Sequence, residues 1–307
     1  LMQIRYVIQP TARLVERRMS ELKIRTLGEQ RCHLGEGPLW DPVAAAFYWV
    51  DSFGPSLYRN DFRSGKTEVW SLPGETVGSI AVRAQGGLIL AMDKGFYAFD
   101  PASSRIESIA QPLAGRRGLR LNDGKVDPYG GFVAGAMNID YTRHENCAMY
   151  RLSPELEVTE ILDGFDCFNG PCFSADGGYL YVTGREEGVI EVFDYGSTQQ
   201  PRNGRILLDH CNPDGATVDE EGFIWSAQWD DQRVLRISPQ GRIHTQLEFP
   251  GHIVSSVMFG GPQLDLLYVT TIGDEVHGVA PSADAAGRVL VVAETGFRGR
   301  AEPAFRG

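Results

Sequence analysis

The amino-acid sequence predicts an all-β protein, a six-bladed β-propeller built around a central channel. Three observations support this prediction. A ten-residue motif recurs along the chain, its copies are spaced by a nearly constant interval, and the segments between them are short aromatic and β-branched runs divided by glycine and aspartate turns. Short strands that repeat at a fixed spacing, without helical patterns between them, are typical of sheets arranged radially around an axis.

The motif is clearest at residues 169–178, where a small polar residue precedes a short apolar core and an acidic glycine turn. We call the first residue of each copy an opener. The openers are Glu36, Gly78, Asn122, Asn169, Asp214 and Ser255, at intervals of 42, 44, 47, 45 and 41 residues. A period in the forties corresponds to one four-stranded blade. Six openers therefore predict six blades.

The runs between openers are assigned to strands in chain order. Segment 22–34 is expected to form the outer strand that closes the last blade, because a ring would otherwise leave an exposed sheet edge. The predicted strands are 39–40, 46–50, 56–59 and 67–70 in blade one, 79–82, 87–92, 95–100 and 106–109 in blade two, 124–126, 131–137, 148–152 and 158–162 in blade three, 178–183 and 189–193 in blade four, 223–228 and 233–237 in blade five, and 266–271 and 288–292 in blade six. Two longer segments, 138–146 and 272–287, follow second strands and are expected to shape a binding site on one face of the ring.

Length and composition fit one large globular domain. Of the 307 residues, 42% are hydrophobic and 22% are charged, which is ordinary for such a domain. We assign residues 19–307 to a single propeller and expect residues 1–18 to be disordered or vector-derived, with Met19 as the native initiator. No apolar run approaches the roughly 18 residues of a membrane helix, and residues 1–18 lack the apolar core of a secretory signal. These features predict a cytoplasmic location.

Charge and cysteine content narrow the range of partners. The net charge of −11 argues against nucleic acid, whose phosphates need a basic protein face, and no membrane partner is expected. The five cysteines form no C-x-x-C pair, and their odd number indicates reduced thiols rather than a disulfide framework. The six histidines occupy no opener and are expected at the surface or in loops. The predicted partner is a small molecule, and the predicted assembly is a monomer or a small homo-oligomer.

The chemistry of the openers indicates a cation site. If the openers begin the innermost strands, they lie at equivalent depth around the mouth of the channel. The Glu, Asp and Asn openers then supply two carboxylates and one or two amide oxygens, which suit a single hard divalent cation. The alternative is that Asn-Gly and Asp-Gly are ordinary turn dipeptides. The shared register of these residues in four blades favours the cation site.

Several sequence blocks resemble the SMP-30/gluconolactonase/regucalcin family of sugar lactonases over about residues 34–299. The matching stretches are Gly35-Glu-Gly-Pro-Leu-Trp, Arg120-Leu-Asn-Asp-Gly-Lys-Val-Asp-Pro-Tyr-Gly, Ala134-Gly-Ala-Met, Asn169-Gly-Pro, Asn212-Pro-Asp-Gly and Phe259-Gly-Gly. The second block is the most specific. The resemblance implies a six-bladed propeller that hydrolyses sugar lactones with the help of one divalent cation.

The resemblance also implies roles for individual residues. By this match, Glu36, Asn169 and Asp214 bind the cation, which could be Ca²⁺, Zn²⁺, Mn²⁺, Mg²⁺ or Fe²⁺. Arg120 and Asn122 contact the substrate, and Asp140 lies where the family often has a substrate-binding acid. As the catalytic residue, Asp214 would orient or deprotonate the attacking water. Direct activation of that water by the cation is the open alternative, because a carboxylate bound to a cation is a poor base.

The chain departs from the family pattern at 183–185, where Thr-Gly-Arg replaces a Thr-Asp-Ser-like triplet. The change removes an acid and adds the fork-shaped donor of Arg185 near the end of a predicted strand. We therefore predict that Arg185 binds substrate and shifts specificity. The alternative is that Arg185 points to solvent or pairs with Glu186 or Glu187.

Taken with the resemblance, these residues predict a metal-dependent hydrolase that opens a sugar (aldono) lactone to its sugar acid in cytosolic carbohydrate oxidation. Two alternatives remain at this stage. One is a promiscuous metal-dependent esterase or organophosphate hydrolase using the same cation. The other is a non-catalytic cation-binding or scaffold propeller, since a fold does not determine a function.

Overall fold

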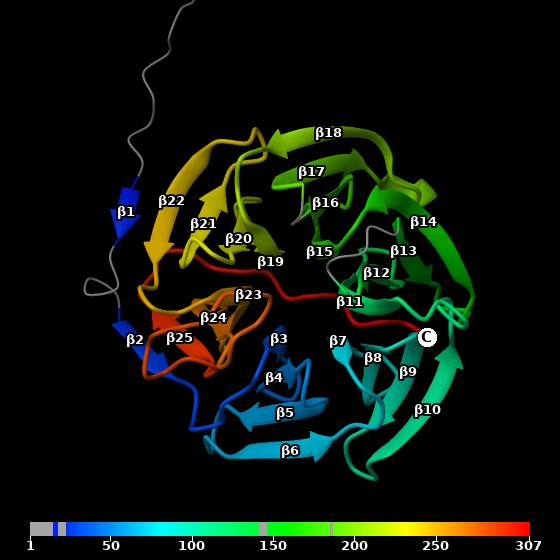
Figure 1. Cartoon of the computed structure of the whole chain (residues 1–307), viewed down its shortest axis with the longest axis horizontal. Coiled ribbons are helices and arrows are strands. Elements are labelled where there is room, and N and C mark those ends of the chain that lie inside the picture. Colours follow the sequence, from blue (N-terminus) through cyan, green and yellow to red (C-terminus); the bar gives the residue numbers. More distant parts are fainter. Residues whose placement is uncertain (1–14, 18–22, 141–145, 185–186) are drawn as a thin grey trace, which may run out of the picture.

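The computed structural model describes residues 15–17, 23–140, 146–184 and 187–307. Within these ranges the strands form six sheets arranged as blades around a common axis (Figure 1). All strand pairs within the blades are antiparallel, apart from one parallel pairing contributed by the N-terminal segment. The predicted all-β, six-bladed propeller is confirmed.

Each blade consists of four strands that follow one another along the chain, except in blade six. Blade one has β3 (Gly35–Asp41), β4 (Ala46–Asp51), β5 (Ser56–Asp61) and β6 (Thr67–Ser71), blade two β7 (Val77–Val82), β8 (Leu88–Met92), β9 (Gly95–Asp100) and β10 (Arg105–Ala110), and blade three β11 (Leu119–Val126), β12 (Phe132–Asn138), β13 (Cys147–Leu152) and β14 (Val158–Phe165). Blade four has β15 (Phe168–Phe173), β16 (Tyr179–Gly184), β17 (Val189–Asp194) and β18 (Arg202–Leu208), with the short 3₁₀ turn η2 (Gly196–Thr198), blade five β19 (Pro213–Val218), β20 (Ile224–Gln228), β21 (Arg233–Ile237) and β22 (Ile243–Glu248), and blade six β23 (Val254–Gly260), β24 (Leu266–Thr271) and β25 (Leu290–Ala293). Nowhere in the described ranges is there a helix with the length and apolar character needed to cross a membrane.

The N-terminal segment completes the ring. Strand β2 (Lys23–Thr26) pairs antiparallel with β25 and becomes the outer strand of blade six, as predicted for segment 22–34. Strand β1 (Val15–Arg17) lies parallel to β22 at the edge of blade five. The rest of the predicted leader, residues 1–14 and 18, and the predicted initiator Met19 lie outside the described residues. The boundary at residue 19 therefore stays a prediction.

The first strands of the blades line the channel, and each contacts the first strand of the next blade. Every one of these inner strands contains an opener close to its start and shows a break in pairing register at or beside it. Such a bulge bends the strand and redirects a side chain. The openers thus lie at bulges within the strands, so that Asn169-Gly170 is part of β15 and not a turn.

Glycines beside the openers allow the inner strands to approach closely. Gly37 and Gly170 adopt positive φ angles of 54° and 52°, which side chains rarely tolerate. A Cβ atom on Gly170 would lie 2.7 Å from the carbonyl oxygen of Asp214, and one on Gly78 would lie 2.4 Å from that of Asn122. The missing side chains therefore bring neighbouring openers together at one end of the channel.

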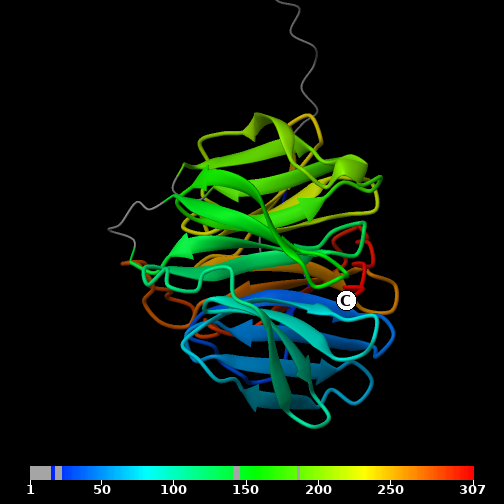
Figure 2. The same ribbon diagram turned by 90° about the vertical axis from the view of Figure 1, so that its right-hand side faces the viewer.

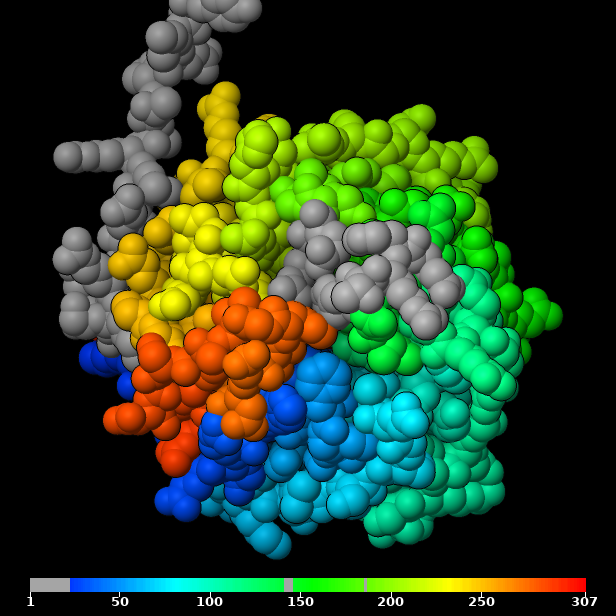
Figure 3. All heavy atoms as spheres, in the orientation of Figure 1, coloured from blue at the N-terminus to red at the C-terminus, as the bar shows by residue number. Residues whose placement is uncertain are grey.

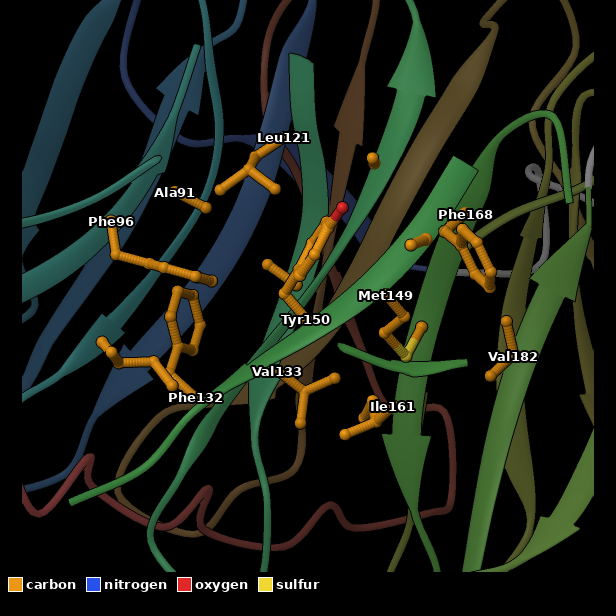
Figure 4. Close-up of a cluster of buried hydrophobic side chains, with 14 of the residues drawn as sticks. Ala91, Phe96, Leu121, Phe132, Val133, Met149, Tyr150, Ile161, Phe168 and Val182 are labelled. Atoms are coloured by element: carbon orange, nitrogen blue, oxygen red, sulfur yellow. The ribbon is translucent and has the colours of Figure 1, made fainter. Parts of the chain in front are cut away.

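The hydrophobic core lies between the blades, and polar groups lie along the channel axis. Figure 4 shows part of it, where Phe96, Phe132 and Phe168 come from three successive blades and are fully buried. The rings of Phe96 and Phe132 meet edge to face, with centroids 5.9 Å apart. Burying one such side chain stabilises the fold by about 1.5–3 kcal/mol. These contacts set the positions of the blades, and so of the openers.

The two ends of the channel are covered by different segments. The C-terminal tail, residues 294–307, crosses one face of the ring (Figures 1 and 2), where Gly299 bridges Asp219 and Phe305 bridges Arg83. The loop between β24 and β25, residues 272–289, lies on the opposite face (Figure 2). This second face carries the openers, and Val276 and His277 of the predicted 272–287 loop lie beside them. Residues 141–145 of the other predicted loop lie outside the described residues.

Candidate metal and substrate site

A pocket opens at the mouth of the channel on the opener face, the face seen in Figure 3 with the orange loop after β24 near its centre. Its volume is about 280 Å³, part of it continuous with solvent. Its lining residues are Leu34, Glu36, Arg120, Asn122, Met137, Asn169, Asp214, Trp229, Val276 and His277.

Five of the residues predicted for the site line this one pocket. They are Glu36, Arg120, Asn122, Asn169 and Asp214. Each is 9% exposed or less, although charged and amide side chains are seldom buried without partners. They come from the inner strands of blades one, three, four and five. The fold therefore gathers in one pocket residues that are up to 178 positions apart in the sequence.

A directed chain of hydrogen bonds orients the two asparagines. Arg120 Nη1 donates to Asn122 Oδ1 at 2.9 Å, and Asn122 Nδ2 donates to Asn169 Oδ1 at 2.6 Å. Asn169 Nδ2 in turn lies 3.5 Å from Cys167 Sγ. Because a guanidinium only donates, Arg120 sets the direction of the whole chain. The oxygen of Asn169 keeps a second lone pair for another partner.

The two carboxylates of the pocket are short of positive charge. The pKa of Glu36 is raised well above its usual value, mainly because the group is buried and also because Asp214 and Asp123 repel its negative form. The Gly37 N–H and the Arg120 guanidinium act in the opposite direction and do not compensate. A bound cation would remove this repulsion. The oxygen atoms that could bind it belong to carboxylate and amide groups, which hard divalent cations prefer as ligands. The residues present therefore fit a divalent cation.

Hydrogen bonds between side chains and backbone groups hold the inner strands of blades three, four and five beside one another. Asp123 accepts the N–H of Gly124 at 2.8 Å on its own strand and the N–H of Gly170 at 2.9 Å on the next blade. Burial raises the pKa of Asp123, while the charge of Lys125 lowers it. Thr183 Oγ1 donates to the carbonyl oxygen of Asp214 at 2.9 Å. Blades three, four and five are thus joined just below the pocket.

The other two predicted site residues are not part of the described pocket lining. Asp140 is exposed, follows β12 and is not among the lining residues. Arg185 lies outside the described residues, which end at Gly184 on that side and resume at Glu187. The substrate-binding roles of Asp140 and Arg185 therefore stay predictions.

The sequence predicted only some of the residues that form the apolar side of the pocket. Trp229, which follows the second strand of blade five, lines the pocket together with Val276 and His277. Phe53 lies behind this wall, with its ring 6.5 Å from that of His277. Val276 and His277 belong to the long loop after β24. In the sequence, only the length of this loop indicated that its residues could reach the site. His252 lies in the loop between β22 and β23, as expected, but it is only 3% exposed and therefore buried.

Fold and site together define a six-bladed propeller with a pocket lined by two carboxylates and two side-chain amides at one end of its channel. The chain belongs to the SMP-30/gluconolactonase/LRE-like family, whose model matches residues 34–273. The resemblance seen in the sequence is thereby confirmed.

Relatives of known name agree with this assignment. The chain is 33% identical to the 6-deoxy-6-sulfogluconolactonase of Pseudomonas putida, over 78% of this chain and 83% of the relative. It is 32% identical to a pentonolactonase of Haloferax volcanii, over 90% and 94% of the two chains. Among solved structures, a luciferin-regenerating enzyme superposes with a TM-score of 0.86 at 28% identity, covering 93% of this chain and 100% of the other.

Proposed function

We propose that the protein is a metal-dependent hydrolase that opens a sugar lactone to its sugar acid in cytosolic carbohydrate oxidation, with Glu36, Asn169 and Asp214 as cation ligands. The lactonase class is common to its named relatives in two different organisms. One observation carries the cation requirement. Two buried carboxylates and an amide oxygen share a pocket in which burial, followed by repulsion from Asp214 and Asp123, raises the pKa of Glu36 well above its usual value.

The pocket residues can divide the work of lactone hydrolysis among them. A bound divalent cation polarises a carbonyl group and stabilises developing negative charge. Water adds to the lactone carbonyl carbon, and the Asp214 carboxylate accepts a proton from that water. The ring C–O bond then breaks, and the same proton returns to the departing ring oxygen. The products are one carboxyl group and one hydroxyl group on a single molecule.

The remaining residues bind and orient the sugar. Arg120 uses Nη1 for Leu121 O and Asn122 Oδ1, which leaves its other donors for substrate hydroxyls. Leu34, Met137 and Trp229 give the pocket an apolar side against which the C–H face of a sugar ring can pack.

The test is turnover of a panel of sugar lactones, followed with a pH indicator. We expect hydrolysis by the wild type, loss on chelation, and recovery when a divalent cation is added. Glu36→Gln and Asp214→Asn should fall to the background rate and still fold, because neither side chain belongs to the hydrophobic core. Asp176→Asn, which alters an exposed acid in the turn after β15, is the control and should retain full activity. Cation binding without turnover would support the scaffold alternative, and chelator-resistant turnover in both variants would exclude the proposed site.

A further inference from the structure

A buried thiol touches the asparagine pair beneath the pocket. Cys167 is 2% exposed and directly precedes β15, two positions before Asn169. Its Sγ lies 3.5 Å from Asn169 Nδ2 and 3.9 Å from Asn122 Nδ2. An isolated bridge between Cys167 and Met137 ties its backbone to β12. The position of the thiol is therefore fixed from two strands.

The thiol accepts from Asn169 in the hydrogen-bond chain that begins at Arg120. If the amide of Asn169 flipped, its Nδ2 would face Asn122 Nδ2 at the 2.6 Å now spanned by a hydrogen bond, and two donors would oppose each other. Asn122 cannot flip in response, because its oxygen accepts from Arg120 and its Nδ2 donates to Phe168 O at 3.0 Å. A flip would also place the Asn169 oxygen against Sγ. The flip of Asn169 would therefore lose hydrogen bonds in a buried place, where a donor without an acceptor is costly.

We infer that Cys167 is a positioning residue, which accepts the Asn169 N–H and so keeps the Asn169 oxygen available to the cation. This inference rests on the proposed cation site. Cys167 is not itself a lining residue, so it acts through Asn169 and not on the substrate. Residues behind a metal ligand that fix its orientation typically change metal affinity by about 10–100-fold when they are removed.

The first test measures Ca²⁺ affinity by calorimetry on chelator-treated protein. Cys167→Ala and Cys167→Val remove the acceptor, and we expect each to weaken binding by about tenfold or more, whereas Cys167→Ser keeps an acceptor and should stay within about threefold of wild type. Cys172→Ala is the matched control, because Cys172 is 1% exposed in the core of blades four and five. It should lower the melting temperature in EDTA without changing Ca²⁺ affinity. Unchanged affinity in Cys167→Ala and Cys167→Val would overturn the inference, as would an affinity loss that follows the melting temperature equally in Cys172→Ala.

The second test needs no metal. In ¹⁵N-labelled, metal-free protein, the side-chain amide signals of Asn169 should shift in Cys167→Ala and stay in place in Cys172→Ala. Signals that do not move in Cys167→Ala would overturn the positioning role. If the wild type binds none of Ca²⁺, Mn²⁺ and Zn²⁺, the proposed cation site fails, while the amide signals still decide whether Cys167 orients Asn169. The two failures are thus distinguishable.

Discussion

At the scale of single residues, the proposed cation ligand Glu36 lowers the stability of the metal-free protein. Glu36 is buried against Asp214, and its pKa is raised because burial and like charge disfavour its ionised form. A carboxyl group whose pKa is higher in the folded state than in the unfolded state contributes stability below its unfolded pKa, and this contribution is lost as pH rises through the folded pKa. In metal-free protein near neutral pH, the charge of Glu36 therefore opposes folding.

Glu36→Gln should show this conflict directly. Gln resembles the protonated acid and carries no charge, so in EDTA the variant should match or exceed the wild type in stability. The difference should widen as the pH rises above about 4.3, the ordinary pKa of a glutamate in the unfolded chain, and should stop widening once the raised pKa of the folded state is passed. Saturating Ca²⁺ should stabilise the wild type alone, by about 2.7 kcal/mol at a hundred times the dissociation constant. Thermal melts across this pH range check the prediction, and a variant that melts well below wild type in EDTA at every pH would contradict it.

At the scale of strands, glycine at the opener position of blade two lets the inner strands of blades two and three approach each other. A Cβ on Gly78 would lie 2.4 Å from the carbonyl oxygen and 2.6 Å from the Cα of Asn122. Both contacts are backbone, so β7 and β11 must separate if Gly78 is replaced. Asn122 would then lose register with Asn169, its hydrogen-bond partner across the blade boundary.

Gly78→Ala should therefore impair both folding and the site. Overpacking of this kind typically costs about 1–3 kcal/mol, and we expect in addition a higher KM for the lactone as Asn122 and Arg120 shift. Urea unfolding and steady-state kinetics measure the two effects. Gly54→Ala is a suitable control, because the nearest atom to its added Cβ is a side-chain oxygen at 3.4 Å. A Gly78→Ala enzyme with normal stability and KM would show that the inner strands β7 and β11 can accommodate the added methyl group.

The strands also show which parts of the site a sequence can predict. The recurrence of openers predicts the blade number and places Glu36, Asn169 and Asp214 at one end of the channel, because equivalent positions in a radial repeat lie at equivalent depth. It does not distinguish a bulge from a turn, since both use Asn-Gly and Asp-Gly. Cys167 and His277 escaped prediction because their contacts depend on neighbouring blades and on the path of a loop, neither of which has a periodic signal.

At the scale of the whole molecule, the two ends of the chain complete the ring. Strand β2 supplies the outer strand of blade six from the N-terminal side, so that this blade also has four strands. The C-terminal tail crosses the channel on the face away from the site (Figure 2). There Glu302 lies 3.5 Å from Lys125 and 3.5 Å from the hydroxyl of Thr217. The tail therefore joins inner strands of different blades without reaching the pocket.

Phe305 anchors this tail. Its side chain is fully buried in the core cluster shared by blades two, three and four. Its N–H donates to Val82 O at 2.8 Å, and its carbonyl oxygen accepts the N–H of Ala84 at 2.7 Å. The tail thus gains both a hydrophobic anchor and two backbone hydrogen bonds at the end of β7. Because none of these residues lines the site, the tail should act on stability alone.

Phe305→Ala separates these two properties. Truncation of a fully buried Phe typically costs about 3–5 kcal/mol, so the variant should unfold at clearly lower urea concentration while kcat and KM at a temperature where it is folded stay near wild type. Arg300→Ala is the control within the same tail. It removes one exposed hydrogen bond to Ala175 O and should change stability by less than about 1 kcal/mol. A fall in kcat for Phe305→Ala under folded conditions would mean that closure of the far face is transmitted through the inner strands to the pocket, and unchanged unfolding would mean that the tail does not hold the blades together.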